Sequence, residues 1–253
     1  GQLPAAAEVG TVFVAGATGN TGKRVVKELL SQGYNVVAGA RSLDKAKTAF
    51  ASSTKVESVA FDVEKMSADA MADSLKGAKL VICAMGFVPG NPFEMNRLAK
   101  AVDNEGTIKL VDAAKKAGVQ RFILVSSILT NGRAIGQESN PGFVITNAFG
   151  GALDEKLIAE KYLAKSGLDY TILRPGGLKD AAPEGTAVIG AEDTLLAGEV
   201  SRDLVAKVAV DALRKSGASR KTVELIEDGS CLSNIQKCEA LPAGQADAAK
   251  WFT

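Results

Sequence analysis

The sequence contains no histidine. This absence excludes a histidine general base, the Ser-His-Asp arrangement of many hydrolases, and most zinc and haem sites. Cysteine is also scarce, and the three present do not form a disulfide framework. Cys83 stands in an apolar segment and is interpreted as a packed core residue, whereas Cys231 and Cys238 could pair or respond to redox state. We expect no metal site.

Neither sign of charge is in excess, and no long hydrophobic run is present. Thirty lysines and arginines stand against 29 aspartates and glutamates, for a formal net charge of +1. No global electric field therefore favours nucleic acid or an anionic membrane. The most apolar stretch, residues 80–90, is shorter than the roughly 18 residues that span a bilayer and fits a buried strand with its exit loop. The composition is typical of a globular protein.

Short apolar segments alternate with helical ones from residue 11 onward. Strands are expected at 11–15, 35–40, 56–61, 79–84, 121–126, 169–174 and 222–225, and helices at 21–32, 43–50, 67–75, 94–117, 153–166 and 201–215. A break in the helix over 94–117 is expected near Gly106. Strand interiors that are almost wholly apolar indicate a parallel sheet covered on both faces. The pattern predicts a single α/β domain with a doubly wound parallel sheet, the Rossmann type.

This domain is expected to span residues 11–228, between an N-terminal extension of residues 1–10 and a C-terminal tail of residues 229–253. Within it, Pro175–Val200 is rich in glycine, alanine and proline. The part of this segment after Leu178, residues 179–200, is expected to form a lid, in a small C-terminal element on the substrate side. The insert Asn131–Asn147 contains glycine, asparagine, serine and proline, and we expect it to be the least ordered segment.

A glycine-rich turn, VFVAGATGNTG, follows the first strand. Gly16, Gly19 and Gly22 stand between that strand and the head of a helix, where glycine permits a tight turn, close approach of a diphosphate and close helix–strand packing. The unpaired N–H groups and the positive end of the helix dipole favour phosphate there. A lone glycine motif is weak evidence, but this one is flanked by the strand and helix it requires. The motif predicts a dinucleotide-binding site.

The end of the second strand, VVAGARS, bears on the choice of cofactor. In this fold an acidic residue there accepts the 2′-hydroxyl of NAD, and an arginine accommodates the 2′-phosphate of NADP. The chain has Arg41 and Ser42 at this point, with Lys45 one turn further on. NADP is therefore the predicted cofactor. Asp62 and Val63, just after the third strand, are placed to border the adenine.

Four segments together resemble the atypical short-chain dehydrogenases/reductases of the NmrA-like kind: GATGNTG, VVAGARS, EGTIKLVDAAKKAGVQRFILVSS and SGLDYTILRPGGL. Within that family the chain resembles the dehydrogenase domain of the chloroplast inner-envelope translocon component that binds ferredoxin-NADP reductase. The resemblance covers about residues 11–228 and implies an NADP-binding Rossmann domain. It also implies a chloroplast location, stromal or peripheral on a plastid membrane, with the cyanobacterial cytoplasm as the alternative. The Pro/Ser-rich reductase-binding repeats are absent here, so that partnership is not implied.

The resemblance also assigns catalytic positions. Active family members have Y-x-x-x-K on the helix after the fifth strand, with Ala-Glu three residues after the lysine. Lys156 is followed by Ala159 and Glu160, so Lys156 would hold the nicotinamide ribose. The tyrosine that protonates the substrate carbonyl is replaced by Ala152, which cannot act as an acid. Ser126 follows the fifth strand, where the family keeps its carbonyl-binding serine, and a serine alone is a poor acid near neutral pH.

No other tyrosine is expected to replace the missing one. Tyr162 lies about 240° around the helix from Lys156, and Tyr170 lies inside a strand. The segment RPGGL resembles the family's loop beside the nicotinamide, where backbone groups of Gly176 and Gly177 are expected to meet the carboxamide. The residues predicted to bind the cofactor are Gly16, Thr18, Gly19, Asn20, Thr21, Gly22, Arg41, Ser42, Lys45, Asp62, Val63, Ala84, Met85, Gly86, Ser126, Lys156, Pro175, Gly176 and Gly177.

Two functions remain open at this point. The first is an NADP(H)-binding protein with little or no carbonyl reduction, serving redox sensing or a structural role with protein partners in a plastid or photosynthetic membrane assembly. The second is an active NADPH-dependent reductase of a carbonyl or quinone, with water, Lys156 or the substrate itself as the acid. The missing tyrosine disfavours the second, and the intact glycine turn with Arg41 disfavours a domain that has lost its nucleotide.

Overall fold

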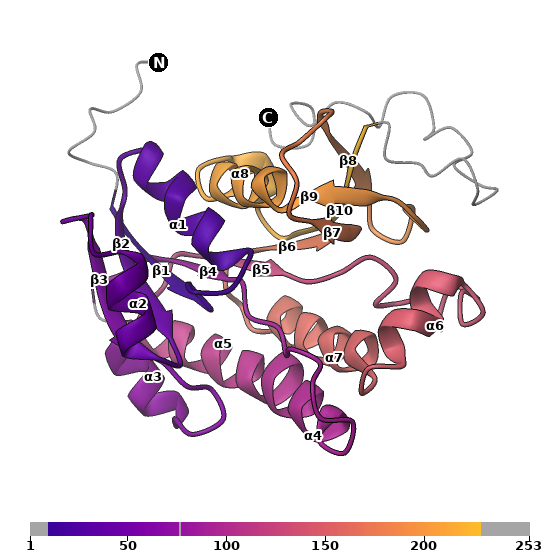
Figure 1. The fold of residues 1–253 in the computed structure, drawn as a ribbon, viewed down its shortest axis with the longest axis horizontal. Coiled ribbons are helices and arrows are strands. Elements are labelled where there is room, and N and C mark those ends of the chain that lie inside the picture. Colours follow the sequence, from indigo (N-terminus) through magenta and orange to yellow (C-terminus); the bar gives the residue numbers. More distant parts are fainter. Residues whose placement is uncertain (1–9, 76, 229–253) are drawn as a thin grey trace.

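The computed structural model describes residues 10–75 and 77–228. Figure 1 shows its elements in chain order. They are β1 (Thr11–Ala15), α1 (Gly22–Ser31), β2 (Asn35–Ala40), α2 (Leu43–Ala49), β3 (Val56–Ala60), α3 (Ala68–Ser74), β4 (Leu80–Cys83), α4 (Met95–Ala99), a π-helical turn (Lys100–Gly106), α5 (Thr107–Lys116), β5 (Arg121–Val125), α6 (Pro141–Asn147), α7 (Ala152–Lys165), β6 (Tyr170–Pro175), β7 (Gly177–Lys179), β8 (Ala187–Ala191), β9 (Glu199–Ser201), α8 (Arg202–Ala212), a 3-10 turn (Ser216–Ala218) and β10 (Lys221–Glu227).

The main sheet has the strand order β3-β2-β1-β4-β5-β6-β10-β8. Neighbours from β3 to β10 pair in parallel, and only β8 runs antiparallel, beside β10. The chain leaves β1 toward β2 on one side and later returns to place β4 on its other side. Crevices at such a reversal point, outside the carboxyl ends of the strands, are where open α/β sheets bind ligands. The predicted doubly wound α/β fold is confirmed.

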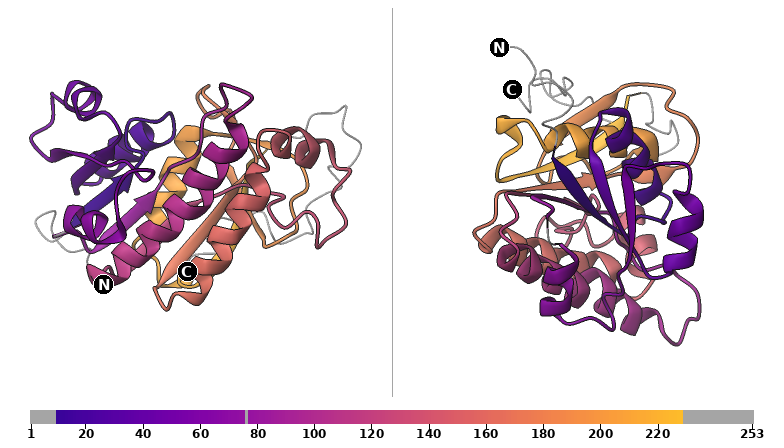
Figure 2. Two further views of the ribbon diagram at one scale, coloured as in Figure 1. Left: turned by 90° about the horizontal axis from the view of Figure 1, so that it is seen from below. Right: turned by 90° about the vertical axis from the view of Figure 1, so that its left-hand side faces the viewer.

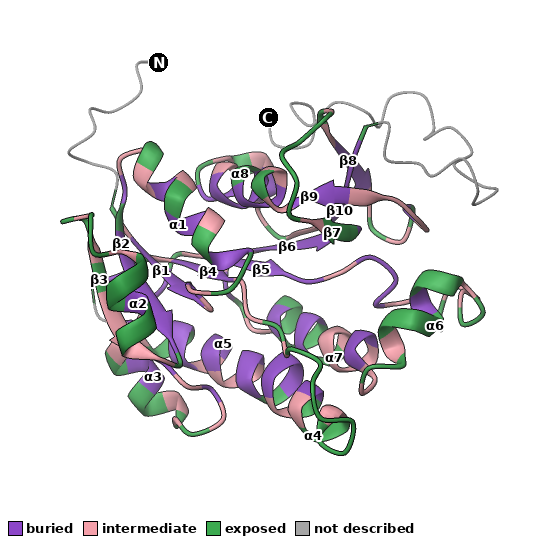
Figure 3. Cartoon of the chain, in the orientation of Figure 1, coloured by how far each residue is buried: buried purple, intermediate pink, exposed green. Residues whose placement is uncertain are grey.

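Helices cover both faces of the sheet, and each face has its own core (Figure 2). Val25 and Leu29 of α1 pack with Val205 and Val208 of α8 on one face. On the other face, α3, α5 and α7 contribute a second buried cluster. The strands of the main sheet are mostly buried between these layers, whereas the outer sides of the helices are exposed (Figure 3). Near-continuous apolar strands follow from this double coverage.

The helix expected over residues 94–117 is interrupted earlier than expected. It consists of α4, the π-helical turn Lys100–Gly106 and α5. A Cβ on Gly106 would lie 2.6 Å from the Val63 side chain and 2.8 Å from the Ala101 carbonyl. Glycine at the end of the wide turn therefore lets the helix pack closely on the loop after β3. Such turns add a residue to the helix and are frequent at functional sites.

Helix α6 and strands β7, β8 and β9 were not expected. The insert 131–147, predicted to be the least ordered segment, ends in helix α6. Asn140 caps that helix by accepting a hydrogen bond from the Gly142 N–H (2.9 Å) and donates another to the Leu196 carbonyl (3.1 Å). The expected lid, residues 179–200, contains the last residue of β7, all of β8 and most of β9. Strand β8 extends the main sheet, and β7 and β9 pair with each other. Cys231, Cys238 and the predicted tail lie outside the described residues.

Candidate functional site

The glycine turn lies in the crevice between the carboxyl ends of β1 and β4. A Cβ on Gly16, which has φ +75°, would lie 2.9 Å from the Ala84 carbonyl, and one on Gly22 would lie 2.0 Å from the Gly16 carbonyl. These two glycines permit close packing of the turn. Gly19 differs, because its Cβ would meet only the Gly16 carbonyl, at 3.3 Å, and the residue lines a pocket. Gly19 is thus the glycine beside which a ligand has room.

The head of α1 fits a phosphate group. Thr21 stands at the N-cap without a side-chain hydrogen bond to the helix, so the first N–H groups of α1 have no side-chain acceptor. Gly19, Asn20 and Thr21 all line the pocket. The N–H groups of Lys23, Arg24 and Val25 already donate to backbone carbonyls of Gly19 and Thr21. The N–H groups before Lys23 and the helix dipole are what remain to attract an anion. The site predicted for a diphosphate thus has a helix N-terminus beside open pocket space, with Thr18 in the same turn.

The predicted adenosine end lies beside this turn, outside the pocket lining. β1 and β2 run side by side with Ala15 opposite Gly39, so Arg41 emerges next to the glycine turn. Arg41 is exposed and makes no ion pair within the described part of the chain. Ser42 caps α2 by accepting from the Lys45 N–H (3.3 Å). The Ser42 hydroxyl and the N–H groups of the Arg41 guanidinium can still donate hydrogen bonds to a phosphate.

Asp62 and Val63 have structural partners. The Asp62 side chain accepts from the Glu64 N–H (3.0 Å) and pairs with Lys65 (3.6 Å). Val63 is buried against Gly106, and its carbonyl accepts a hydrogen bond from Lys109. The Val63 side chain therefore belongs to the core.

A cavity of about 1130 Å³ extends from the glycine turn across the sheet edge toward α6. Its lining includes the predicted residues Gly19, Asn20, Thr21, Ala84, Met85, Gly86, Ser126, Lys156, Pro175, Gly176 and Gly177. The structure thus brings together residues from four different strand ends. Binding pockets for small molecules and cofactors usually measure about 300–1,000 Å³, so this cavity exceeds the usual range.

Lys156 reaches the pocket from α7 and is held by a residue that the sequence did not indicate. Its Nζ lies 3.0 Å from Oδ1 of Asp103, in the π-helical turn. Asp103 also accepts from the Phe87 N–H (3.3 Å), and Gly86 lies directly beside the pair. The second Asp103 oxygen is buried without a hydrogen-bond partner. Asp103, Ser126 and Lys156 also line a void of about 10 Å³, close to the room that one water needs.

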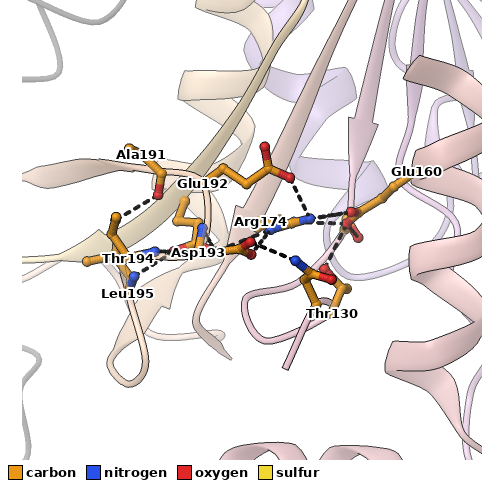
Figure 4. A network of polar contacts seen from close by, with 11 residues as sticks. Thr130, Glu160, Arg174, Ala191, Glu192, Asp193, Thr194 and Leu195 are labelled. Carbon is orange, nitrogen blue, oxygen red and sulfur yellow. Dashed lines mark hydrogen bonds and ion pairs between the residues drawn. The ribbon is translucent and has the colours of Figure 1, made fainter. Parts of the chain in front are cut away.

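Ser126 contacts a buried ionic network, of which Figure 4 labels Thr130, Glu160 and Arg174. Its hydroxyl donates to Glu160 Oε1 at 2.5 Å, and Thr130 donates to the same oxygen at 3.2 Å. Glu160 in turn pairs with Arg174 at 2.7 Å. A hydroxyl that gives its proton to a buried carboxylate is not positioned to give that proton to a substrate in the pocket.

Arg174 is the single cation at the centre of this network. It is within ion-pair distance of four carboxylates: Glu160, Glu192, Asp193 and Glu224. Burial opposes its charge, but hydrogen bonding to Glu160 and the surrounding carboxylates raise its pKa above the ordinary value. Burial also raises the pKa of Glu224, which accepts from the N–H groups of three consecutive residues, 193 to 195. The network therefore fixes the loop after β8 to β6, β10 and α7.

The tyrosine position is closed off. Ala152 begins α7, is 5% exposed and does not line the pocket. Tyr162 points to the opposite side of α7, where its hydroxyl donates to Asp112 (2.7 Å), and Tyr170 begins β6. No tyrosine of the described chain therefore stands where an acid beside Lys156 is needed.

Pro175, Gly176 and Gly177 line the pocket, but their N–H groups are not free. The Gly176 N–H donates to the Leu225 carbonyl (2.8 Å), and the Gly177 N–H donates to the Gly198 carbonyl (2.9 Å). A Cβ on Gly176 would lie 2.4 Å from the Gly198 carbonyl. Close packing against that carbonyl therefore accounts for a glycine at this position. Of the backbone groups predicted to meet the carboxamide, the N–H donors of Gly176 and Gly177 are thus engaged, which leaves their carbonyl groups.

No helix within residues 10–75 and 77–228 combines the length and apolarity that crossing a bilayer requires. In the same part of the chain, no three histidine, cysteine, aspartate or glutamate side chains come together as metal ligands would. Cys83 is fully buried, as predicted, and burial raises the pKa of its thiol to about 11.

Known proteins were compared with the chain. Residues 16–216 match the model of a family described as NAD(P)H-binding. The Arabidopsis thaliana chloroplastic protein At2g34460 is 50% identical over 227 residues, covering 89% of this chain and 80% of that protein. The pea protein TIC 62, chloroplastic, is 38% identical over 86% of this chain, which spans only 43% of TIC 62. The oxidoreductase ylbE of Lactococcus lactis has a similar structure, with a TM-score of 0.73 and 28% identity over 86% of this chain and 90% of that one. By the fold, the glycine turn and these matches, the chain belongs to the NAD(P)H-binding atypical short-chain dehydrogenase/reductase family.

Proposed function

We propose that this protein binds NADP(H) in a chloroplast and has little or no carbonyl reductase activity of its own. The bound nucleotide serves redox sensing or the stability of an assembly with protein partners. The observation that carries this proposal is the buried Ala152, 5% exposed and outside the pocket lining, at the position of the family's acid. General acid catalysis typically contributes about 10²–10⁴-fold in rate.

The two polar side chains that the family places beside the reacting carbonyl, Lys156 and Ser126, already have partners in the fold. Lys156 is paired with Asp103, and the Ser126 hydroxyl donates to Glu160. Neither arrangement disturbs nucleotide binding, because the Lys156 ammonium group has further protons to donate to ribose hydroxyls. Loss of proton transfer with retention of the nucleotide is the outcome that fits both contacts.

The preference for NADP over NAD rests on Arg41. It is exposed, unpaired within the described residues, and next to the glycine turn through the β1–β2 pairing. An arginine at this place accommodates the 2′-phosphate. The chloroplast assignment rests on the two chloroplastic relatives. Since the chain spans less than half of TIC 62, the partners of that longer protein do not carry over.

A second candidate function is an NADPH-dependent reductase of a carbonyl or quinone. The observation that favours it is the cavity of about 1130 Å³, which continues past the predicted nicotinamide site to α6. A protein that held a nucleotide only for stability would have no use for this additional room. Lys156, water or the substrate would have to act as the acid.

One measurement separates the two functions. Purified protein is titrated with NADPH and NADH by calorimetry, and NADPH oxidation is followed in the steady state over a panel of aldehydes, ketones and quinones. If the protein only binds the nucleotide, we expect NADPH to bind more tightly than NADH and turnover to stay near the uncatalysed rate. Robust turnover that Lys156→Ala or Ser126→Ala abolishes would replace it with the reductase.

A further inference from the structure

The pocket is charged at one end. Arg202 lines it near the glycine turn and pairs with Asp180 (2.9 Å). Arg24 binds the same Asp180 (3.4 Å) and the Asn20 carbonyl (2.7 Å). Glu199 lies beside Gly177 in the predicted nicotinamide segment. The charged lining residues of the pocket, Lys156, Glu199 and Arg202, thus gather where the nucleotide is expected.

The other end, here called the α6 half, is apolar. It is lined by Val88, Ile128, Leu129, Ile145 and Leu196, which come from the loops after β4, β5 and β8 and from α6. One hydrophobic cluster contains Leu129 and Phe143, and Leu196 packs against it. No lining residue of the α6 half has a charged side chain within the described chain.

The polar groups of the α6 half are uncharged. They are the side chains of Ser127, Gln137, Ser139, Asn140 and Thr146. Asn140 is fully occupied, because its oxygen accepts from Gly142 and its amide donates to Gln137 (3.1 Å) and Leu196 (3.1 Å). The remaining hydroxyls and amide can orient a polar atom of a ligand, but they cannot neutralise a phosphate or carboxylate.

Two large apolar side chains of this half are exposed. Val88 is 71% exposed and Ile145 is 63% exposed, although both line the cavity. Contiguous exposed apolar surface next to a concavity marks a binding site more often than a bare surface. A molecule lying in the α6 half would cover both side chains.

We propose that the α6 half binds an uncharged, largely apolar small molecule next to the nucleotide. The proposal deepens the proposed function and rests on it, because the nucleotide site defines which half remains open. The chemistry excludes phosphorylated sugars and nucleotide sugars as the second ligand, since their anionic groups would meet no cation there. A flat or elongated neutral ring compound with one carbonyl or hydroxyl group fits the lining.

The test uses Nile red, a neutral apolar dye whose fluorescence rises on binding. The full chain is titrated with the dye in the presence and absence of saturating NADPH, and menadione and UDP-glucose are added as competitors. We expect saturable dye binding, displacement by menadione and no displacement by UDP-glucose. Ile145→Asp and, separately, Val88→Asp should weaken dye binding about ten-fold or more, because each places a charge in the apolar lining.

Two controls match these variants. Val144→Asp changes the neighbouring residue of α6, which is 51% exposed but does not line the pocket, and Ile158→Asp changes an isoleucine of α7 that is 48% exposed outside it. Both should bind the dye like the unmodified protein. Since Val88 lies in a loop, its variant remains informative if Ile145→Asp disturbs the short helix α6.

The outcomes separate this proposal from the proposed function. If NADPH binds by calorimetry but the dye does not, or if UDP-glucose displaces the dye, the apolar site is wrong while the nucleotide function stands. If NADPH does not bind, the proposed function is wrong, and dye binding without nucleotide still reports on the α6 half. Dimerisation that Ile145→Asp abolishes, seen by analytical ultracentrifugation without dye binding, would assign the surface to a second copy and overturn the proposal.

Discussion

Lys156 and Asp103 form an ion pair at the floor of the pocket, with Nζ 3.0 Å from Oδ1. The Asp103 side chain is 1% exposed, and the Lys156 side chain is 19% exposed. The pair therefore joins α7 to the π-helical turn, and Lys156 has a structural role besides any contact with a nucleotide.

Lys156→Met should lower the free energy of unfolding by about 1–3 kcal/mol, because it leaves a buried carboxylate without its cation. Urea denaturation measures this change. Lys161→Met, an exposed position on the same helix, is the control and should have no effect. The double variant Lys156→Met/Asp103→Leu should recover part of the loss. A single variant as stable as the unmodified protein would show that the ion pair does not stabilise the fold.

Arg41→Ala should weaken NADPH binding about ten-fold or more and leave NADH binding nearly unchanged, because a charge-assisted contact with the 2′-phosphate is worth roughly 1.5–3 kcal/mol. Calorimetry with both nucleotides makes the comparison. Lys47→Ala, an exposed cation on α2, is the control for a general loss of positive charge. Equal losses for NADPH and NADH would contradict the assignment of Arg41 to the phosphate.

Gly19→Val and Gly22→Val should fail in different ways. At Gly19 the new side chain meets only the Gly16 carbonyl at 3.3 Å, so the fold should survive while the side chain fills the space of the diphosphate. At Gly22 a Cβ would lie 2.0 Å from the same carbonyl, so the turn itself must shift and thermal stability should fall. Nucleotide titration and thermal unfolding of both variants test this. Undiminished binding by Gly19→Val would mean that phosphates bind elsewhere.

The features that the sequence predicted well are those that depend on local pattern. Apolar strands, glycine stops and the glycine turn specify the doubly wound sheet and the crevice beside Gly16, since parallel strands end at the same edge. The sequence identified Lys156 and Ser126 through a resemblance. Their partners lie 53 and 34 positions away in the chain, and no local periodicity reports on such contacts.

Asp103 could not be identified because a π-helical turn adds a residue and shifts the helical phase. Asp103 is one of several charged residues in the helix expected over 94–117, and nothing in the sequence distinguished it from the others. Helix α6 was missed because it is short and contains Pro141 and Gly142; its cap and its anchor depend on Asn140 and the distant Leu196. Strand β8 was missed because β10, its sheet partner among the described residues, follows some thirty residues later.

Cys83 should make stability depend on alkaline pH. Its thiol pKa is about 11 in the fold against 9.0 for an unperturbed thiol, so the folded state holds the proton more tightly. The contribution is fully present below about pH 9 and is lost as the pH rises toward about 11. Between about pH 8 and 10 the free energy of unfolding should fall by about 1 kcal/mol more in the unmodified protein than in Cys83→Ala. Equal pH slopes for the two proteins would show that this thiol does not titrate on unfolding.

Ala152→Tyr tests whether chemistry can be restored. In the active enzymes that the chain resembles, a tyrosine stands one helical turn before the lysine. Here that position is Ala152, whose methyl group is buried outside the pocket lining. Enlarging a well-packed site typically costs about 1–3 kcal/mol, so we expect lower thermal stability, retained NADPH binding and no gain in NADPH oxidation. Ala164→Tyr, at an exposed position of the same helix, controls for the added ring. The decisive quantity is steady-state NADPH oxidation with aldehydes and quinones. An increase of 10²-fold or more, the lower end of what general acid catalysis contributes, would show that the pocket still presents a carbonyl to this helix and that only the acid was lost.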